Sequence, residues 1–267
     1  MSKIKFRRKH LSIPYFLFLV CFVLIPLILI IYYALSNEDG SLSLNNFTKF
    51  FSSKDKIGLL SVSVIIGALN TVLCILIGYP IAMLLTKNKR RNNKISIMIL
   101  LFIMPMWINF VLRTAATRDL LYWIGLDGGR YPYLATMIGM VYNYLPFTIL
   151  PLYSQMLKMD NSLIEASYDL GANKFQTFFK TRIPLTMPGI ISGAMMVFMP
   201  TMSSFVISDV MGERKIQLIG NTIQFNFDQM RWHEGSFIAF VMLVIIGISM
   251  LITRNVKTEE NVRGGLW

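Results

Sequence analysis

The sequence predicts an all-α membrane protein that crosses the bilayer about six times. Of its 267 residues, 54% are hydrophobic and only 15% are charged, which is outside the usual range for a soluble domain of this size. Long apolar runs alternate with short basic clusters, and a bilayer core needs about 20 apolar residues to be crossed. Because no internal repeat of about 20–50 residues is present, the chain is predicted to form a single transmembrane domain, 1–267.

The predicted spans follow the apolar runs, at residues 11–35, 59–86, 95–112, 133–156, 187–208 and 236–253. The first run exceeds the roughly 7–15 apolar residues of a signal peptide, so it is predicted to be a retained span. Pro105 interrupts the third span. In the fifth, Gly189 and Gly193 form a small-residue pair that lets another helix approach closely. Segment 113–129 mixes charged residues with Leu, Tyr and Trp, which predicts a helix at the membrane surface.

Basic residues predict the orientation of these spans. Lys and Arg number 5 before the first span, 5 after the second, 4 between the fourth and fifth and 3 in the tail, against 9 in the other connecting segments. Since positive residues favour the cytoplasmic side, both termini are predicted to be cytoplasmic. The loop between the fourth and fifth spans, 157–186, is then cytoplasmic as well.

This loop is polar and is predicted to form two short helices. Ser162 followed by Glu165 is a capping-box pattern, which predicts a helix over 163–170, and Gly171 can supply the left-handed residue that ends it. Asn173 with Gln176 repeats the start signal in weaker form.

The second short helix is predicted to end at Pro184, with Phe175, Phe178 and Phe179 on one face. Helices this short are unstable alone in water, so the loop is expected to rest on the surface of another protein.

Several function classes find no support in the residues. His10 and His233 lack partners at metal spacing, and Cys21 and Cys74 lie in apolar runs, so neither a metal site nor a disulfide is predicted. The net charge of +12 lies in clusters between apolar runs, which disfavours nucleic-acid binding. The spans carry no constellation of catalytic residues, and a channel would need a pore ring and no cytoplasmic loop of this kind.

The loop resembles the EAA loop by which permeases of ABC importers engage their ATPase subunits. In this sequence the resemblance rests on Glu165-Ala166-Ser167, then Gly171, then Pro184. Ser167 stands at the position of a second Ala, and Thr181 stands at an Ile position, where it weakens a packing contact. The resemblance implies that the residues that couple to the ATPase are Glu165, Ala166, Ser167, Asp169, Gly171, Phe175 and Pro184.

A wider resemblance covers the chain from the second span to about residue 226. The stretches GYPIAMLLTK (78–87), MPMWINFVLRTAATRDLL (104–121), YLPFTILPLYSQMLKMD (144–160) and IPLTMPGIISGAMMVFMPTM (183–202), the last followed by SDVMG, are similar to B-type permeases of spermidine/putrescine ABC importers. This implies a type I ABC importer permease fold in the bacterial cytoplasmic membrane. The closest alternative is a permease for another organic cation or an oxyanion.

The resemblance also implies the partners. They would be a second permease chain (PotC type), two ATPase subunits (PotA type) and an extracytoplasmic polyamine-binding protein (PotD type). ATP and Mg would be bound by the ATPase subunits, with no cofactor on this chain. Consistent with that, the sequence contains no GxxxxGK[ST] phosphate-binding loop.

A path for a polyamine should offer carboxylates and aromatic faces to a flexible polycation. Asp209, at the outer end of the fifth span, is the ionisable candidate. The remaining candidates are polar or aromatic residues of the third and fourth spans, namely Trp107, Asn109, Tyr142, Asn143 and Tyr144. Alternatively, the aromatic residues anchor the protein at the interface, and Asp209 faces water or pairs with an arginine such as Arg113.

Overall fold

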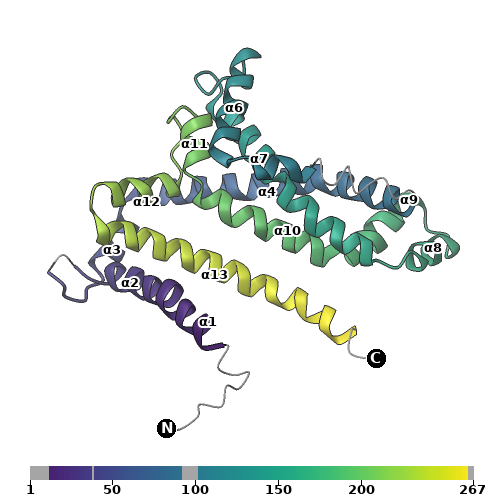
Figure 1. The fold of residues 1–267 in the computed structure, drawn as a ribbon, viewed down its shortest axis with the longest axis horizontal. Coiled ribbons are helices and arrows are strands. Elements are labelled where there is room, and N and C mark those ends of the chain that lie inside the picture. Colours follow the sequence, from purple (N-terminus) through teal and green to yellow (C-terminus); the bar gives the residue numbers. More distant parts are fainter. Residues whose placement is uncertain (1–11, 38, 92–101, 264–267) are drawn as a thin grey trace, which may run out of the picture. The chain divides into compact units, whose positions relative to one another are not determined.

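The computed structural model describes residues 12–37, 39–91 and 102–263, and in this part of the chain the regular secondary structure is helical (Figure 1). The elements in chain order are α1 (Ser12–Leu19), η2 (Val20–Leu24), α2 (Ile25–Ala34), α3 (Asn45–Ser52), α4 (Lys54–Arg91), η4 (Met104–Trp107), α6 (Phe110–Trp123), α7 (Pro132–Lys158), α8 (Ser162–Asp169), α9 (Lys174–Thr177), η5 (Phe178–Arg182), α10 (Ile183–Ser203), α11 (Val206–Met211), α12 (Ile219–Asp228) and α13 (Trp232–Arg263). The chain divides into two compact units, residues 1–57 with 222–245 and residues 58–221 with 246–267.

Five helical segments of the described chain are long and apolar enough to cross a membrane. They are Ile13–Ala34, Lys54–Lys87, Pro132–Lys158, Lys174–Ser203 and Trp232–Leu251. The predicted third span, 95–112, lies partly outside the described residues, and the helix α6 runs through its predicted end near residue 112. In this part the chain forms the 3-10 turn η4 and becomes extended at Ile108. Helix α6 then begins after its N-cap residue Asn109, whose side chain accepts a hydrogen bond from the backbone N of Val111 at 2.9 Å.

The predicted fifth span, 187–208, is also bounded differently. Its helix α10 ends at Ser203, and Asp209 lies on the separate short helix α11. The Ser203 hydroxyl donates to the carbonyls of Met199 and Pro200, at 3.2 and 3.4 Å, which offers these groups an alternative to a continued helix. Ser204 is extended, and the chain turns there.

The prediction that Pro184 ends a helix is wrong, because a π turn precedes the proline. In η5 the backbone N of Ile183 donates to the carbonyl of Phe178, five residues back, and α10 follows without interruption with Pro184 in its first turn. The same arrangement occurs where η2 precedes Pro26. A proline ring clashes with the carbonyl four residues back in a regular α-helix, and the wider π turn relieves this clash.

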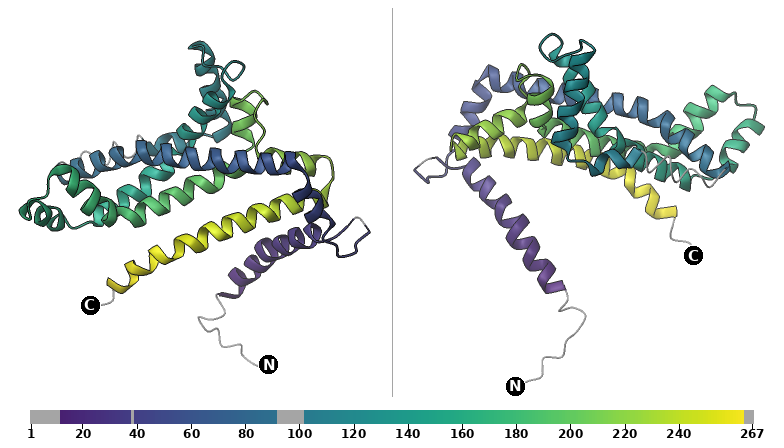
Figure 2. Two further views of the ribbon diagram at one scale, coloured as in Figure 1. Left: turned by 180° about the vertical axis from the view of Figure 1, so that it is seen from behind. Right: turned by 45° about the horizontal axis from the view of Figure 1, so that its top comes forward.

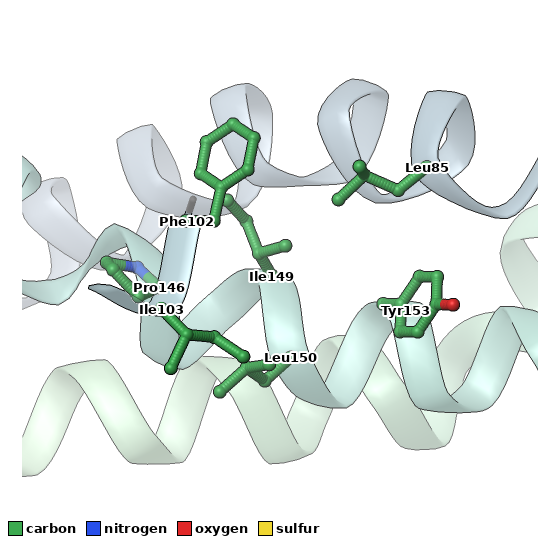
Figure 3. A pocket seen from close by; sticks show the side chains of 7 residues that line it. All are labelled: Leu85, Phe102, Ile103, Pro146, Ile149, Leu150 and Tyr153. Atoms are coloured by element: carbon green, nitrogen blue, oxygen red, sulfur yellow. The ribbon is translucent and has the colours of Figure 1, made fainter. Parts of the chain in front are cut away.

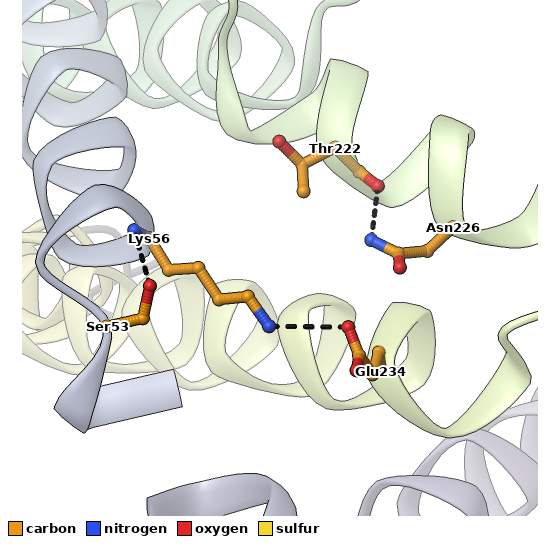
Figure 4. A network of polar contacts seen from close by, with 5 residues as sticks. All are labelled: Ser53, Lys56, Thr222, Asn226 and Glu234. Atoms are coloured by element: carbon orange, nitrogen blue, oxygen red, sulfur yellow. Dashed lines mark hydrogen bonds and ion pairs between the residues drawn. The ribbon is translucent and has the colours of Figure 1, made fainter. Parts of the chain in front are cut away.

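In the first unit, aromatic packing and hydrogen bonds hold α3. Phe50 is buried, and its ring centroid lies 5.6 Å from that of Phe237 in α13. The Asn46 side-chain amide donates to the carbonyls of Ala34 and Ser36, at 3.3 and 3.1 Å, and so satisfies the end of α2. Figure 4 shows Lys56 paired with Glu234 at 3.3 Å in the same unit.

In the second unit, α4, α7 and α10 lie side by side (Figures 1 and 2). Gly189 and Gly193 face α7, where an added Cβ would lie 2.8 Å from Gln155 Cβ and 3.3 Å from the Thr148 backbone respectively. This confirms the predicted close approach. Hydrogen bonds between side chains then join α4 to α10: Asn70 to Thr201 at 2.8 Å and Tyr79 to Thr186 at 3.1 Å.

The interior between α4 and α7 is filled by side chains. Figure 3 shows the side chains that line a small cavity there, namely Leu85, Phe102, Ile103, Pro146, Ile149, Leu150 and Tyr153. The volume of this cavity is about 10 Å³. Its space is about that of one water molecule and its lining is mostly apolar, so it cannot hold a solute and is part of the packed core.

Candidate functional site

The loop helix α8 begins one residue earlier than predicted, and the side chain of its N-cap residue, Asn161, makes no capping hydrogen bond. Ser162 is its first helical residue, and its backbone N donates to Asp160 Oδ1 at 3.0 Å. The predicted capping box of Ser162 and Glu165 is therefore wrong. Asp160 is the better acceptor here, because a carboxylate also interacts favourably with the positive end of a helix. Glu165 is left exposed on α8.

The end of α8 is the glycine turn that the sequence predicts. Gly171 has φ +83°, and its backbone N donates to the Tyr168 carbonyl at 2.8 Å. The backbone N of Ala172 reaches the Ser167 carbonyl at 3.1 Å, which completes a Schellman motif. Because no atom lies within 4 Å of a Cβ added at Gly171, the backbone conformation alone requires glycine there.

The next helix, α9, begins with a complete capping box. The backbone N of Gln176 donates to Asn173 Oδ1 at 2.8 Å, and the backbone N of Asn173 donates to Gln176 Oε1 at 3.0 Å. The start signal predicted from Asn173 is thus confirmed, and it is the stronger of the two in the loop.

The three phenylalanines predicted to share a face are divided by the π turn. The Phe178 ring meets Tyr79 of α4 edge-on, with centroids 5.5 Å apart, and packs against the core. Phe175 and Phe179 lie 4.6 Å apart and are both exposed, Phe175 at 71%. Phe178 therefore anchors the loop to its own chain, while the other two rings are available to a partner.

The outward surface of the loop combines charge, apolar groups and a hollow. Glu165, Ala166, Asp169 and Pro184 are exposed, and Leu170 is 89% exposed. A hollow of about 400 Å³ lies between α8 and η5, lined by Leu163, Ala166, Ser167, Leu170, Gly171, Ala172, Gln176, Lys180 and Thr181. Such a surface suits contact with another protein better than enclosure of a small molecule.

Ser167 differs from its neighbours in the motif because its side chain bonds within the loop. Its Oγ lies 3.0 Å from Thr177 Oγ1 and accepts a hydrogen bond from Thr181 Oγ1 at 3.3 Å. Thr177 has a relative exposure of 2%. Sequence reasoning missed Thr177, although its spacing of four residues from Thr181 places both on one helical face.

The second group of predicted residues surrounds Arg113 in α6, which is 8% exposed. Its Nε donates to Asn143 Oδ1 at 2.9 Å and its Nη1 to the Pro105 carbonyl at 2.8 Å. The guanidinium lies 5.6 Å from the centroid of Tyr142. Asn143, itself buried, also donates to Thr114 Oγ1 at 3.2 Å. The predicted Asn143 is therefore one part of a saturated network.

The other candidates of the third and fourth predicted spans are placed differently. Tyr144 donates through its hydroxyl to the Pro200 carbonyl of α10 at 3.3 Å. Asn109 is occupied as the cap of α6, and Trp107 is 86% exposed. Of the predicted residues, Asn143 and Tyr144 therefore lie in the interior, and Trp107 and Asn109 lie at the surface. Tyr142 is partly exposed beside Arg113.

Asp209 is held by a residue that the sequence did not single out, Asn221. The Asn221 amide donates to Asp209 Oδ1 and, at 3.3 Å, to the Phe205 carbonyl. Asn221 Oδ1 accepts from Ser208 Oγ at 2.9 Å and from the backbone N of Leu218 at 2.8 Å. One amide therefore fixes the segment around α11. The alternative pairing of Asp209 with Arg113 is not formed, since Asp209 is bonded to Asn221 and the Arg113 guanidinium to Asn143 and the Pro105 carbonyl.

The helix α11 lies beside α6 (Figure 1), and a common core holds both against α7. This core contains Leu121, Met140, Ile207 and Met211. We call the assembly of α6, α7 and α11 the path region and residues 157–186 the coupling loop. The structure thus gathers Arg113, Tyr142, Asn143, Tyr144 and Asp209 on one assembly.

Comparisons with known proteins show which sequences and folds this chain is similar to. The family described as binding-protein-dependent transport system inner membrane component matches residues 75–256. The chain is 34% identical to the spermidine/putrescine transport system permease protein PotB of Haemophilus influenzae, over 89% of each chain. The identity to PotB of Escherichia coli (strain K12) is also 34%, over 88% of this chain and 92% of that one. A PotB homolog of Mycoplasma genitalium is 27% identical, over 81% of this chain and 79% of the relative.

Among solved structures, the chain is similar to one in the crystal structure of a bacterial alginate ABC transporter in complex with an alginate pentasaccharide-bound periplasmic protein. The TM-score is 0.65 at 14% identity, with 93% of this chain and 94% of that one covered. At this level of identity the likeness shows the fold alone, and the fold is that of an ABC transporter chain. This agrees with the fold class predicted from the sequence.

Proposed function

Because this chain belongs to the family of binding-protein-dependent transport system inner membrane components, we propose that it forms, with a second permease chain, the path for polyamine uptake in an ATP-driven importer. The observation that carries the substrate class is the identity of 34% to spermidine/putrescine permeases over almost the whole chain. The relatives are named as transport permeases, so the chain is a multi-pass membrane component and not an enzyme.

The family implies a multi-subunit ABC importer with a further permease, an ATPase and a binding protein. We propose that these partners are a PotC-type permease chain, two PotA-type ATPases and a PotD-type polyamine-binding protein. ATP and Mg would then be bound on the ATPase subunits. The absence of a phosphate-binding loop from this sequence supports that division.

The coupling loop supplies the surface proposed for the ATPase. Its exposed side chains include a ring pair, Phe175 and Phe179, and an exposed Leu170 beside the hollow. Exposed aromatic groups on short helices are the usual anchors when a helix lies in a groove of another protein. Glu165 and Asp169, four residues apart and both exposed, add negative charge to the same helix.

Within the path region, Asp209 is the residue we propose to meet an amine of the substrate. One of its oxygens accepts from Asn221, so the carboxylate is held at a fixed position on α11. Tyr142 is partly exposed and offers an aromatic face, whereas Asn143 and Tyr144 are engaged with other helices. Trp107 and Asn109 lie at the surface and would contribute only outside the interior of this chain.

One observation favours a second candidate substrate, an oxyanion. Arg113 is a buried cation that forms no ion pair with any residue of the described chain. A free cation would repel a polyamine and attract an anion. Its Nε and Nη1 are, however, directed at Asn143 and the Pro105 carbonyl, which gives the guanidinium a structural role and leaves polyamine as the proposed substrate.

The test is reconstitution of the complete transporter in liposomes with its binding protein. Spermidine is expected to stimulate ATP hydrolysis and to accumulate inside only when ATP is supplied on the ATPase side. A transporter that ignores spermidine and putrescine but responds to sulfate or phosphate would replace the polyamine assignment with the oxyanion one. Failure of the chain to copurify with any ATPase would contradict the importer assignment itself.

A further inference from the structure

The hydroxyl groups of Ser167, Thr177 and Thr181 form a cluster, the hydroxyl clasp, between the two arms of the coupling loop. Ser167 lies on α8, Thr177 ends α9, and Thr181 lies in the π turn η5. The distances from Ser167 Oγ to the two threonine hydroxyls are 3.0 and 3.3 Å. Within the described chain, these are the hydrogen bonds between side chains that join α8 to the segment α9–η5.

The turn between the two arms does little to fix their angle. Leu170 is 89% exposed, and no atom lies within 4 Å of a Cβ placed on Gly171. The Schellman motif and the capping box of Asn173 define where each helix ends and begins, but both act within the backbone of the turn. The relative position of the arms therefore depends on contacts between side chains of α8 and side chains of α9–η5. The hydroxyl clasp, with its buried Thr177, supplies the polar contacts among them.

The two departures from the motif are partners in the structure. Ser167 replaces an alanine and Thr181 replaces an isoleucine of the pattern. With alanine at position 167, Thr181 would face an apolar neighbour and Thr177 would lose its hydroxyl partner. Because Thr181 donates a hydrogen bond to Ser167, neither hydroxyl is left without a partner, which would cost free energy. The sequence predicts that Thr181 weakens a packing contact. In the structure Thr181 instead replaces an apolar contact between the arms with a polar one.

The clasp is continuous with the helix that enters the membrane core. η5 passes into α10 without a break, and α10 is bonded to α4 through Thr186 and Tyr79 at 3.1 Å and through Thr201 and Asn70 at 2.8 Å. A displacement of α8 that the clasp transmits would therefore reach the contacts of α10 with α4. Without the clasp, a displacement of α8 would bend the turn at Gly171 and would not be transmitted to α10.

We infer that the hydroxyl clasp makes α8 and α10 move as one body and so carries the motion of the ATPase into the membrane helices. The inference rests on the proposed function for its partner, but the rigidity it describes belongs to this chain. Thr177 and Thr181 are positioning residues in this scheme, since they act through Ser167 and lie on the inner side of α8.

The coupling test uses the complete reconstituted transporter with spermidine as the probe. The variant Thr181→Val removes the hydroxyl and keeps the shape of the side chain, and Thr181→Ser keeps the hydroxyl. We expect Thr181→Val to copurify with the ATPase but to lower the spermidine taken up per ATP hydrolysed by about 5-fold or more. Thr181→Ser should keep the ratio of the unchanged protein, because it retains the hydroxyl that donates to Ser167. An unchanged ratio in Thr181→Val would overturn the inference.

A second measurement keeps the inference testable if spermidine is not the substrate. Hydrogen exchange of the backbone amides of α8 is followed in the purified complex, with no substrate present. Thr181→Val and Thr177→Val should each raise the exchange rates of residues 162–169 by about 5-fold or more, and the matched serine variants should not. Unchanged exchange in both valine variants would disprove the clasp, whereas raised exchange without spermidine uptake would reject only the polyamine assignment.

Discussion

The helices α6 and α8 end in the same kind of turn but are fastened to the chain in different ways. Gly125 after α6 has φ +76° and Gly171 after α8 has φ +83°, and both turns are Schellman motifs. Behind Gly125, Leu126 packs against the buried core that contains Leu121. The equivalent position to Leu121 in α8 is Ser167, whose hydroxyl bonds to the other arm of the coupling loop.

This difference extends to the two regions as a whole. In the path region, polar side chains are buried and bind one another, as Arg113 and Asn143 do. In the coupling loop, charged and aromatic side chains such as Glu165 and Phe175 are exposed, and the side-chain hydrogen bonds between its two arms are made by hydroxyl groups. A polar residue in a membrane span is thus a weak indication of substrate contact when its hydrogen-bonding groups are already paired within the chain.

The largest effect is expected where the path region is most strongly held, at Arg113→Lys. Lysine cannot direct two donors in a fork at Asn143 and the Pro105 carbonyl, and it would leave a buried group unpaired. We expect a loss of about 3 kcal/mol in the free energy of unfolding, measured as a lower thermal midpoint and yield in detergent. Arg118→Lys on the same helix is the control, since its pair with Asp119 is exposed. Equal stability of the two variants would show that the path region is not held by Arg113.

The comparison of the two turns is sharpened by placing valine at each glycine. Both sites have open space around an added Cβ, so the substitutions differ only in location. A β-branched residue at positive φ costs about 2 kcal/mol in either turn. Gly171→Val is expected to lower spermidine uptake at least about 10-fold while ATP hydrolysis continues, because the end of α8 shifts. Gly125→Val should lower stability and leave the uptake per ATP hydrolysed unchanged. Normal coupling in Gly171→Val would remove the turn from the mechanism.

Local chemistry made part of the structure predictable. Five of the apolar runs, the glycine stop at Gly171 and the start signal at Asn173 depend on residues close in sequence, and each was predicted. The close approach at Gly189 and Gly193 was predictable because only small side chains permit it. The hydrogen bond of Asp160 at the start of α8 was not, since Asp160 and Ser162 are both good acceptors and lie two residues apart.

The remaining features depend on partners distant in the sequence. Arg113 and Asn143 are 30 residues apart, and Ser167 and Thr181 are 14 apart across a turn, so no local pattern pairs them. The π turn before Pro184 is a local exception: it relieves the clash of the proline ring, so the helix continues where the proline was predicted to stop it. The hub at Asn221 carried no sequence signal, because asparagine is common in loops and its four partners come together only in the fold.

A smaller effect is expected on the outward surface of the coupling loop, at Phe175→Ala. The ring is 71% exposed and contacts the exposed ring of Phe179 at a tilted angle, so its removal should leave the fold intact. Truncation of an interface anchor costs about 1.5 kcal/mol, which corresponds to about a 10-fold weaker association with the ATPase, measured by titration of the solubilised permease. Tyr122→Ala, an exposed aromatic residue on α6, is the control. A similar loss in both variants would mean that the rings act through general stability.

The smallest effect, and the sharpest test of the path region, is expected at Asp209→Asn. Asparagine can still accept the hydrogen bond from Asn221 through its carbonyl oxygen, so the substitution removes charge and retains the local geometry. A hydrogen bond to a charged group exceeds a neutral one by about 1 kcal/mol, so we expect uptake at low spermidine concentration to fall about 5-fold, with normal assembly and basal ATP hydrolysis. Asp119→Asn, on the exposed side of α6, should leave uptake unchanged. If Asp209→Asn also leaves uptake unchanged, Asp209 is structural like Asn143, and the polar groups of the path region serve to hold its helices together.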